Sequence, residues 1–331
     1  MSKKIQFSVL ISCLVLLAGC GSSSSSDSNA AKSGSASGGK KLEIALVPKG
    51  TTHAYWKSVN EGAQKAADEL GVTLDWKSSV KEDDKDGQIQ VVENFVSQKV
   101  DGIGVAPTDD VALETPIKDA IAQGIPVVIF DSAIKDVDVP SFVATDNEAA
   151  GKLGGERLAK LLGGKGKVIM LRYMQGSAST ESREKGALEA LQSNPGIQMV
   201  SDNQFGGATA DTAQSASENL INQFNVGGKF GVDGIFCPNE STAYGMLKAL
   251  QNAGLAGKVK FVGFDSSDPL MDGVKAGQID ALVVQNPVKM GYETVKQLVN
   301  KIKGQPVEKR VDTGAAIIDK DHLTLPGLDT K

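Results

Sequence analysis

Short apolar runs alternate with longer amphipathic segments along the chain from residue 42 onward. The runs are rich in Val and Ile, which is typical of strands buried on both faces. The runs that predict strands are residues 42–47, 73–76, 102–105, 127–130, 142–144, 168–171, 198–200, 234–236, 260–264 and 281–284. The segments with helical periodicity are residues 56–70, 89–98, 114–123, 149–162, 182–192, 212–223, 242–253 and 291–303.

Glycines mark the ends of several of these helices, as helix C-termini favour. They are Gly71, Gly124, Gly163, Gly254 and Gly304. Strands that alternate with helices predict parallel sheets covered on both faces, the doubly wound α/β class. The alternation runs once to about residue 145 and again from about residue 146, so we expect two similar lobes.

Composition and charge narrow the class of protein. The chain has 331 residues, of which 40% are hydrophobic and 23% charged. This is enough for one large or two medium domains with their own cores, and it fits neither a disordered chain nor a membrane-embedded body. The formal net charge is -5, and Lys and Arg are spread along the chain. Nucleic acid is therefore not an expected partner.

The first residues differ from the rest of the chain. Lys3 and Lys4 precede a short apolar run that ends in Leu17-Ala18-Gly19-Cys20. This pattern predicts a secretory signal peptide over residues 1–19, whereas a short N-terminal helix is the alternative. The run resembles a bacterial lipobox, and the resemblance implies cleavage before Cys20 and a lipid anchor on its sulfur. Residues 20–41 are then a Ser- and Gly-rich tether to the cell envelope.

Cysteine and histidine are scarce. Once Cys13 leaves with the signal and Cys20 carries lipid, only Cys237 remains in the folded part, so no internal disulfide is expected. His53 and His322 are the only histidines. We therefore expect no transition-metal site and no cofactor.

Polar side chains follow almost every expected strand, where ligands bind in open α/β sheets. Those in the first half are Lys49, His53, Tyr55, Trp56, Thr108, Asp109 and Asp131. Those in the second half are Arg183, Asn239, Asp265 and Gln285. An Asp or Asn in such a place is equally explained as the N-cap of the next helix, whereas Arg, Gln and Trp are poor caps and favour ligand recognition.

Two further patterns are open to more than one interpretation. Tyr55 and Trp56 are either aromatic ligand contacts or core residues at the start of a helix. Gly163, Gly164 and Gly166 lack the Lys-Ser/Thr ending of a phosphate loop and predict a turn. We find no G-x-S-x-G elbow and no His placed with a Cys or Ser, so an enzyme is not expected.

At these strand ends the sequence resembles the ribose-type periplasmic binding proteins, the type I solute-binding family. The resemblance covers about residues 42–323, and its order and spacing are specific. The matching stretches are residues 63–71, 124–128, 144–147, 182–186, 262–265 and 285–287.

The resemblance implies a ligand set. Tyr55 and Trp56 would stack on a sugar ring, with His53 where the family usually has Asn. The residues that would bind sugar hydroxyls or the ring oxygen are Asp131, Arg183, Asn239, Asp265 and Gln285. Ribose binders have Arg directly after the first of these residues, and Ser132 stands there here, which argues against ribose but not against other sugars. Phe205 is a candidate for the aromatic of the second lobe.

The resemblance also implies the architecture and the function. Three crossings near residues 145–146, 285–286 and 310–312 would join a lobe of residues 42–145 plus 286–310 to a lobe of residues 146–285 plus 311–331. Ligand would bind between the lobes and stabilise a hinge-closed form. The implied protein is a monomeric, extracytoplasmic substrate-binding protein that delivers a sugar to the permease of an ABC transporter.

The charges of the implied ligand set indicate the kind of sugar. Asp131 and Asp265 are negative and Arg183 is positive, while the direction of Lys49 is open. The cleft is then near neutral or slightly acidic, so we expect a neutral monosaccharide or polyol.

Three other functions share parts of this pattern. A receptor that presents its ligand to a sensor or chemotaxis protein would use the same cleft. A sugar-processing enzyme would show turnover, and a LacI-type repressor would need a helix-turn-helix where this chain has the lipobox.

Overall fold

The computed structural model describes residues 40–324. Its first lobe is built on a parallel sheet with the strand order β13-β5-β4-β3-β1-β2. The strands of this sheet are β1 (Glu43–Val47), β2 (Thr73–Trp76), β3 (Gly102–Val105), β4 (Val127–Phe130), β5 (Ser141–Ala144) and β13 (Arg310–Asp312). The helices of this lobe are α1 (Ala54–Leu70), α2 (Lys85–Gln98), α3 (Glu114–Ala122) and α9 (Pro287–Ile302).

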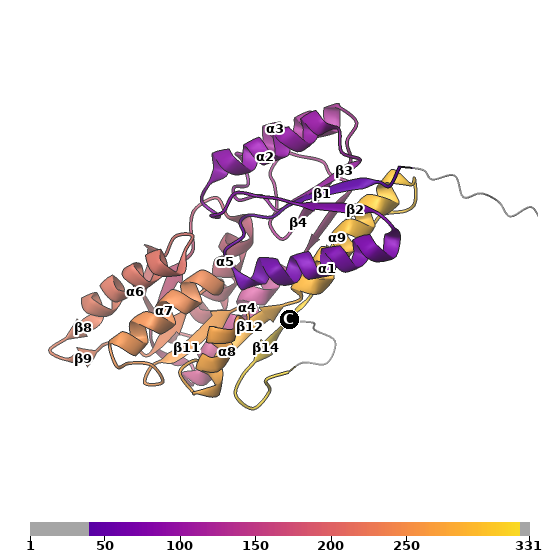
Figure 1. Cartoon of the computed structure of the whole chain (residues 1–331). Coiled ribbons are helices and arrows are strands. Elements are labelled where there is room, and N and C mark those ends of the chain that lie inside the picture. The colour runs from indigo at the N-terminus through magenta and orange to yellow at the C-terminus, as the bar shows by residue number, and fades with distance from the viewer. Residues whose placement is uncertain (1–39, 325–331) are drawn as a thin grey trace, which may run out of the picture. The chain divides into compact units, whose positions relative to one another are not determined.

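Helices cover both faces of this sheet. In β1, Ile44 and Leu46 pack with residues of α1 and α9, whereas Ala45 and Val47 pack with residues of α2 and α3. Successive side chains of a strand point to opposite faces, so an unbroken apolar run is buried on both sides. Figure 1 shows α9, coloured yellow, beside α1, coloured indigo, although the two are far apart in the sequence.

Glycines allow these two helices to touch. A Cβ on Gly62 of α1 would lie 1.9 Å from the carbonyl oxygen of Val288, and one on Gly291 of α9 would lie 1.8 Å from that of Val59. No side chain fits at either position, so the C-terminal helix is held tightly against the lobe that contains β1.

The second lobe repeats the arrangement with the strand order β14-β12-β11-β10-β6-β7, in which only the β12–β14 pair is antiparallel. Its strands are β6 (Lys165–Arg172), β7 (Gly196–Phe205), β10 (Gly234–Phe236), β11 (Lys260–Phe264), β12 (Ala281–Gln285) and β14 (Ala315–Ile318). Its helices are α4 (Asn147–Leu161), α5 (Ala178–Gln192), α6 (Ala210–Phe224), α7 (Glu240–Asn252) and α8 (Asp268–Lys275). A small hairpin of β8 (Asn225–Val226) and β9 (Lys229–Phe230) follows α6.

The chain passes between the two sheets after β5, after β12 and between β13 and β14. The third crossing corrects the expected boundary at residue 310, because Val311 pairs with Val143 and Asp312 with Ala144 in the first sheet. The side chain of Val311 is buried in the core of that lobe, which anchors the strand there. The crossing itself falls at Thr313 and Gly314.

The doubly wound α/β fold is confirmed, and the expected strands and helices are present. Helix α3 begins where its apolar pattern indicates, the other expected helices begin two to four residues earlier, and all of them end within one residue of the expected end. Gly71 ends α1 in the left-handed conformation with φ 69°. The elements that the sequence analysis missed are α8, β8, β9, β13 and β14. Cys20, the expected signal peptide and most of the tether lie outside the described residues. Within residues 40–324, no helix has the length and apolar character needed to span a membrane.

Candidate functional site

The carboxyl ends of strands from both sheets meet at a narrow cavity. All eight residues expected to bind ligand line it: His53, Tyr55, Trp56, Asp131, Arg183, Asn239, Asp265 and Gln285. The other residues that line it are Lys49, Glu82, Tyr173, Ser179 and Thr180. Their role as ligand contacts stays a prediction, but the structure does bring them together.

Asp131 and Asp265 occupy equivalent places in the two lobes. Each directly follows a strand, and each donates its backbone N–H to the neighbouring strand, at Val143 and Val283 respectively. Both have left-handed backbones, with φ of 61° and 68°. This conformation is unfavourable for residues other than Gly, although Asp tolerates it better than most, and such strain concentrates at functional sites. It turns both carboxylates into the cavity.

The aromatic pair of α1 serves the core and the cavity together. Trp56 is only 3% exposed and packs edge-on against Phe130, and its Nε1 donates to Glu82 Oε1 at 2.7 Å. The Tyr55 hydroxyl donates to Asp131 Oδ1 at 2.9 Å. The pair therefore packs with the core and lines the cavity at once, so a core position does not exclude a ligand contact.

Arg183 is held rigidly at the second-lobe wall. Its Nε donates to Asn147 Oδ1 at 2.8 Å and its Nη1 to the Pro238 carbonyl at 3.1 Å. The guanidinium lies 4.4 Å from the centre of the Phe264 ring, a cation–π contact. Because these contacts fix its direction, the guanidinium needs little reorganisation to bind a ligand.

Asn239 and Gln285 have additional structural roles. Asn239 is the N-cap of α7, and its Oδ1 accepts from the backbone N–H of Thr242, so the capping interpretation holds for this residue while it still lines the cavity. Gln285 donates to Asp265 at 2.8 Å and accepts from the Thr145 hydroxyl at 3.0 Å. Thr145 and Gln285 adjoin two of the crossings, so these hydrogen bonds connect the cavity to the segments that join the lobes.

Glu82, which the sequence analysis missed, is the centre of a second polar cluster. Its Oε1 lies 2.6 Å from His53 Nδ1, and its Oε2 accepts from the Tyr173 hydroxyl at 2.6 Å. His53 Nε2 faces the Ala208 carbonyl at 3.2 Å, so both ring nitrogens face acceptors. Burial alone would lower the pKa of His53, but the charge and hydrogen bond of Glu82 outweigh it and raise the pKa to about 9. The same pairing outweighs burial at Glu82 and lowers its pKa to about 2.

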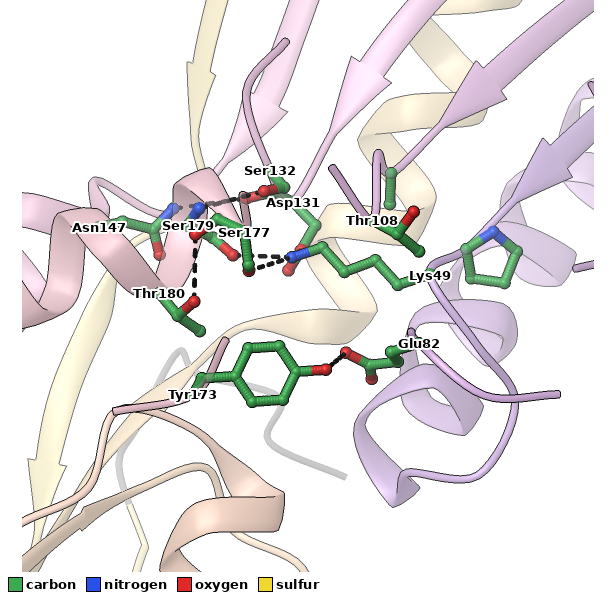
Figure 2. A network of polar contacts seen from close by, with 12 residues as sticks. Lys49, Glu82, Thr108, Asp131, Ser132, Asn147, Tyr173, Ser177, Ser179 and Thr180 are labelled. Atoms are coloured by element: carbon green, nitrogen blue, oxygen red, sulfur yellow. Dashed lines mark hydrogen bonds and ion pairs between the residues drawn. The ribbon is translucent and has the colours of Figure 1, made fainter. Parts of the chain in front are cut away.

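Lys49 points into the cavity. It is 2% exposed, and its ammonium lies 3.0 Å from the hydroxyl oxygens of Ser177 and Ser179 and 3.4 Å from Asp131 Oδ2. Figure 2 shows this side chain reaching across to the two serines, which belong to the start of α5. The position after the first strand was the only signal for it in the sequence.

Tyr173, not Phe205, is the second-lobe aromatic of the cavity. Tyr173 directly follows β6, is fully buried and contacts Glu82 (Figure 2). Phe205 ends β7 and lies beneath the guanidinium of Arg172 at 5.0 Å instead. Burial, together with the nearby Glu82 charge, raises the pKa of Tyr173, so its hydroxyl stays protonated and serves as a donor.

Comparisons with known proteins agree with this fold. The family model described as "Periplasmic binding protein domain" matches residues 44–306. The D-allose-binding periplasmic protein of Escherichia coli K12 is 32% identical over 274 residues, which are 80% of this chain and 86% of that protein.

Solved structures give the same result. A solute-binding protein from Agrobacterium vitis with bound D-fucose is 33% identical with a TM-score of 0.82, and the match covers 87% of this chain and 99% of that one. A carbohydrate transporter solute-binding protein from Agrobacterium radiobacter in complex with D-arabinose is 32% identical, also with a TM-score of 0.82, over 87% and 98% of the two chains. The fold, the cavity between two sheets and these similarities together show that the chain belongs to the periplasmic binding protein family.

Proposed function

We propose that this protein binds a neutral monosaccharide or polyol in the cavity, closes around it and delivers it to the permease of an ABC transporter outside the cytoplasm. The observation that carries the proposal is the balance of charge in the cavity lining. Asp131, Asp265 and Glu82 are matched by three cations, Lys49, Arg183 and protonated His53.

Most of these charges are already paired. Lys49 lies beside Asp131, and His53 beside Glu82. An added ligand charge would have no partner of its own, and burying an unpaired charge is strongly disfavoured. Hydroxyl groups suit such a lining because each can donate to a carboxylate and accept from a cation or an amide.

The names of the relatives support the same class of ligand. The allose, fucose and arabinose of those names and titles are neutral sugars. We propose binding without catalysis, because the cavity groups hold one another in place and the family serves transport. We also propose that the mature protein is a monomer anchored through lipid on Cys20, as the lipobox implies.

A ligand screen tests the proposal. The protein is heated with pentoses, hexoses, deoxy sugars, polyols, uronates and sugar phosphates, and hits are measured by calorimetry. A ligand at 100 times its Kd stabilises the folded state by about 2.7 kcal/mol, which raises the Tm by roughly 5 °C. We expect a neutral sugar or polyol to give the largest shift. Preference for a uronate or a sugar phosphate would contradict the charge argument, and chemical conversion of a bound sugar would contradict binding without catalysis.

A further inference from the structure

The N-terminus of α1 is capped by a residue of the other lobe. The N-cap residue, His53, makes no side-chain capping bond, and the first turn of α1 contains no acidic residue. Instead, the carboxylate of Glu240 accepts from the backbone N–H of Ala54 at 3.2 Å and from that of Tyr55 at 3.1 Å. Glu240 is the first residue of α7, in the second lobe.

The N-terminus of α5 shows the reciprocal arrangement. Its N-cap residue, Ser177, makes no capping bond, because its hydroxyl lies against the ammonium of Lys49. The backbone N–H of Ser179 donates to the hydroxyl of Ser132 at 3.0 Å, and Ser132 belongs to the first lobe. Figure 2 shows Ser132 and Ser179 joined in this way.

Other helices take a cap from their own N-cap residue. These caps are Asp84 for α2, Asp146 for α4, Thr209 for α6, Asn239 for α7 and Asn286 for α9. Two further helices, α3 and α8, have N-cap residues that make no side-chain capping bond. Unlike the five self-capped helices, α1 and α5 take an acceptor from the opposite lobe.

We propose that Glu240 and Ser132 form a reciprocal latch that stabilises the closed arrangement of the lobes by capping helices α1 and α5 across the cleft. The inference rests on the proposed function, since closure matters only if the cleft closes on a ligand. Neither residue lines the candidate ligand cavity, so both are positioning residues.

The energetics of capping favour this role. The first N–H groups of a helix have no partner within the helix, and the positive end of the helix dipole attracts a carboxylate. When the lobes part, the first N–H groups of α1 and α5 lose these protein acceptors and donate to water instead. Each cap then contributes to closure but nothing to the separate lobes. Burial and the nearby Asp265 charge raise the pKa of Glu240, and His53 and the two N–H groups of α1 lessen that rise because they favour the ionised form.

The latch predicts a specific pattern of binding kinetics. A cap is worth about a factor of five in an equilibrium constant. Glu240→Ala and Ser132→Ala should each weaken sugar affinity about fivefold or more, chiefly through faster dissociation. Glu240→Gln keeps an acceptor but loses the charge, so its effect should be smaller. Glu114→Gln is the matched control, because Glu114 is a first-turn glutamate that pairs with Lys118 on its own helix.

The experiment combines stopped-flow binding of the sugar found in the screen, thermal unfolding and small-angle scattering. A merely structural role would lower the Tm of the unliganded variants. A latch should leave that Tm unchanged, lower the extra stability that sugar confers, and shift the radius of gyration toward the open value. Unchanged dissociation rates, or a fall in Tm without sugar equal to the fall with it, would overturn the latch. If the wild type bound no sugar, the proposed function would fail, and the latch, which rests on closure around a ligand, would fail with it. If the wild type bound sugar and the variants released it at the wild-type rate, the latch alone would fail.

Discussion

Replacing His53 by Asn should remove a pH dependence of stability that the His53–Glu82 pair creates. In the unfolded chain the pKa of His53 is about 6.5, and in the folded protein it is about 9. A group whose pKa is raised by folding stabilises the fold fully below its unfolded pKa, and that contribution is lost as the pH rises through its folded pKa. The window for His53 therefore runs from pH 6.5 to about pH 9.

The magnitude follows from the shift. One pKa unit corresponds to 1.36 kcal/mol, so a shift from 6.5 to about 9 corresponds to about 3 kcal/mol. The pKa of Glu82, lowered to about 2, reports the same interaction and is counted once. The contribution of Glu82 to the stability of the fold is present above about pH 4.5 and is lost as the pH falls through about 2. The pair therefore stabilises the fold most between pH 4.5 and 6.5.

Urea unfolding, followed by tryptophan fluorescence at several values between pH 6.5 and 9.5, measures the effect. The wild type should lose about 3 kcal/mol more than His53→Asn across this range. The variant should fold, because Glu82 keeps Trp56 and Tyr173 as donors. His322→Asn removes the other histidine of the chain, which is 73% exposed at its side chain, and should follow the wild type. Parallel pH profiles for wild type and His53→Asn would refute the reasoning.

Three other changes test separate features of the molecule. Asp131→Ala should weaken sugar binding by at least about 2 kcal/mol in calorimetry, because Lys49 loses its buried counter-charge; truncating the exposed Lys57, which lines a neighbouring pocket and not this cavity, should cost less, and an equal loss would contradict the assignment. Gly291→Ala should lower the free energy of unfolding by roughly 1–3 kcal/mol, because its Cβ would lie 1.8 Å from a carbonyl oxygen of α1, and an unchanged urea midpoint would argue against that helix contact. Cys20→Ser should release a soluble, sugar-binding protein into the medium or periplasm, whereas membrane association that persists without lipid would reject the anchor.

Much of the fold could be predicted because apolar residues recur along the sequence with one period in strands and another in helices. Runs such as Val127–Phe130 are buried along their whole length, and their pattern gave the strand without error. The missed elements lack such a pattern. Helix α8 is eight residues long and includes a Pro and a Gly, and β13 is three residues long with two of them exposed. Pairing with a neighbouring strand, which no local pattern reveals, makes β13 a strand.

The residues of the candidate site also fall into some that the sequence could predict and some that it could not. Asp131, Asn239, Asp265 and Gln285 adjoin strand ends, and parallel strands bring their carboxyl ends to one edge of the sheet. Glu82 lies in the loop between β2 and α2, well beyond the strand end, and loop conformation places it in the cavity. Periodicity carries no information about such a loop, so a residue of this kind is found only when the chain is seen in three dimensions.

The net charge of a buried cleft can nevertheless be easier to predict than the individual charged residues that line it. Counting Asp131, Asp265 and Arg183 alone indicated a cleft near neutrality, although three charged groups were left out. Lys49 enters the cavity beside Asp131, and the positive charge of His53 depends on Glu82, which enters with it. A buried charge without a partner is so unfavourable that charged residues enter a cleft in nearly compensating sets. The residues missing from the sequence argument therefore shifted the balance by no more than one charge, and the preference for a neutral ligand survives.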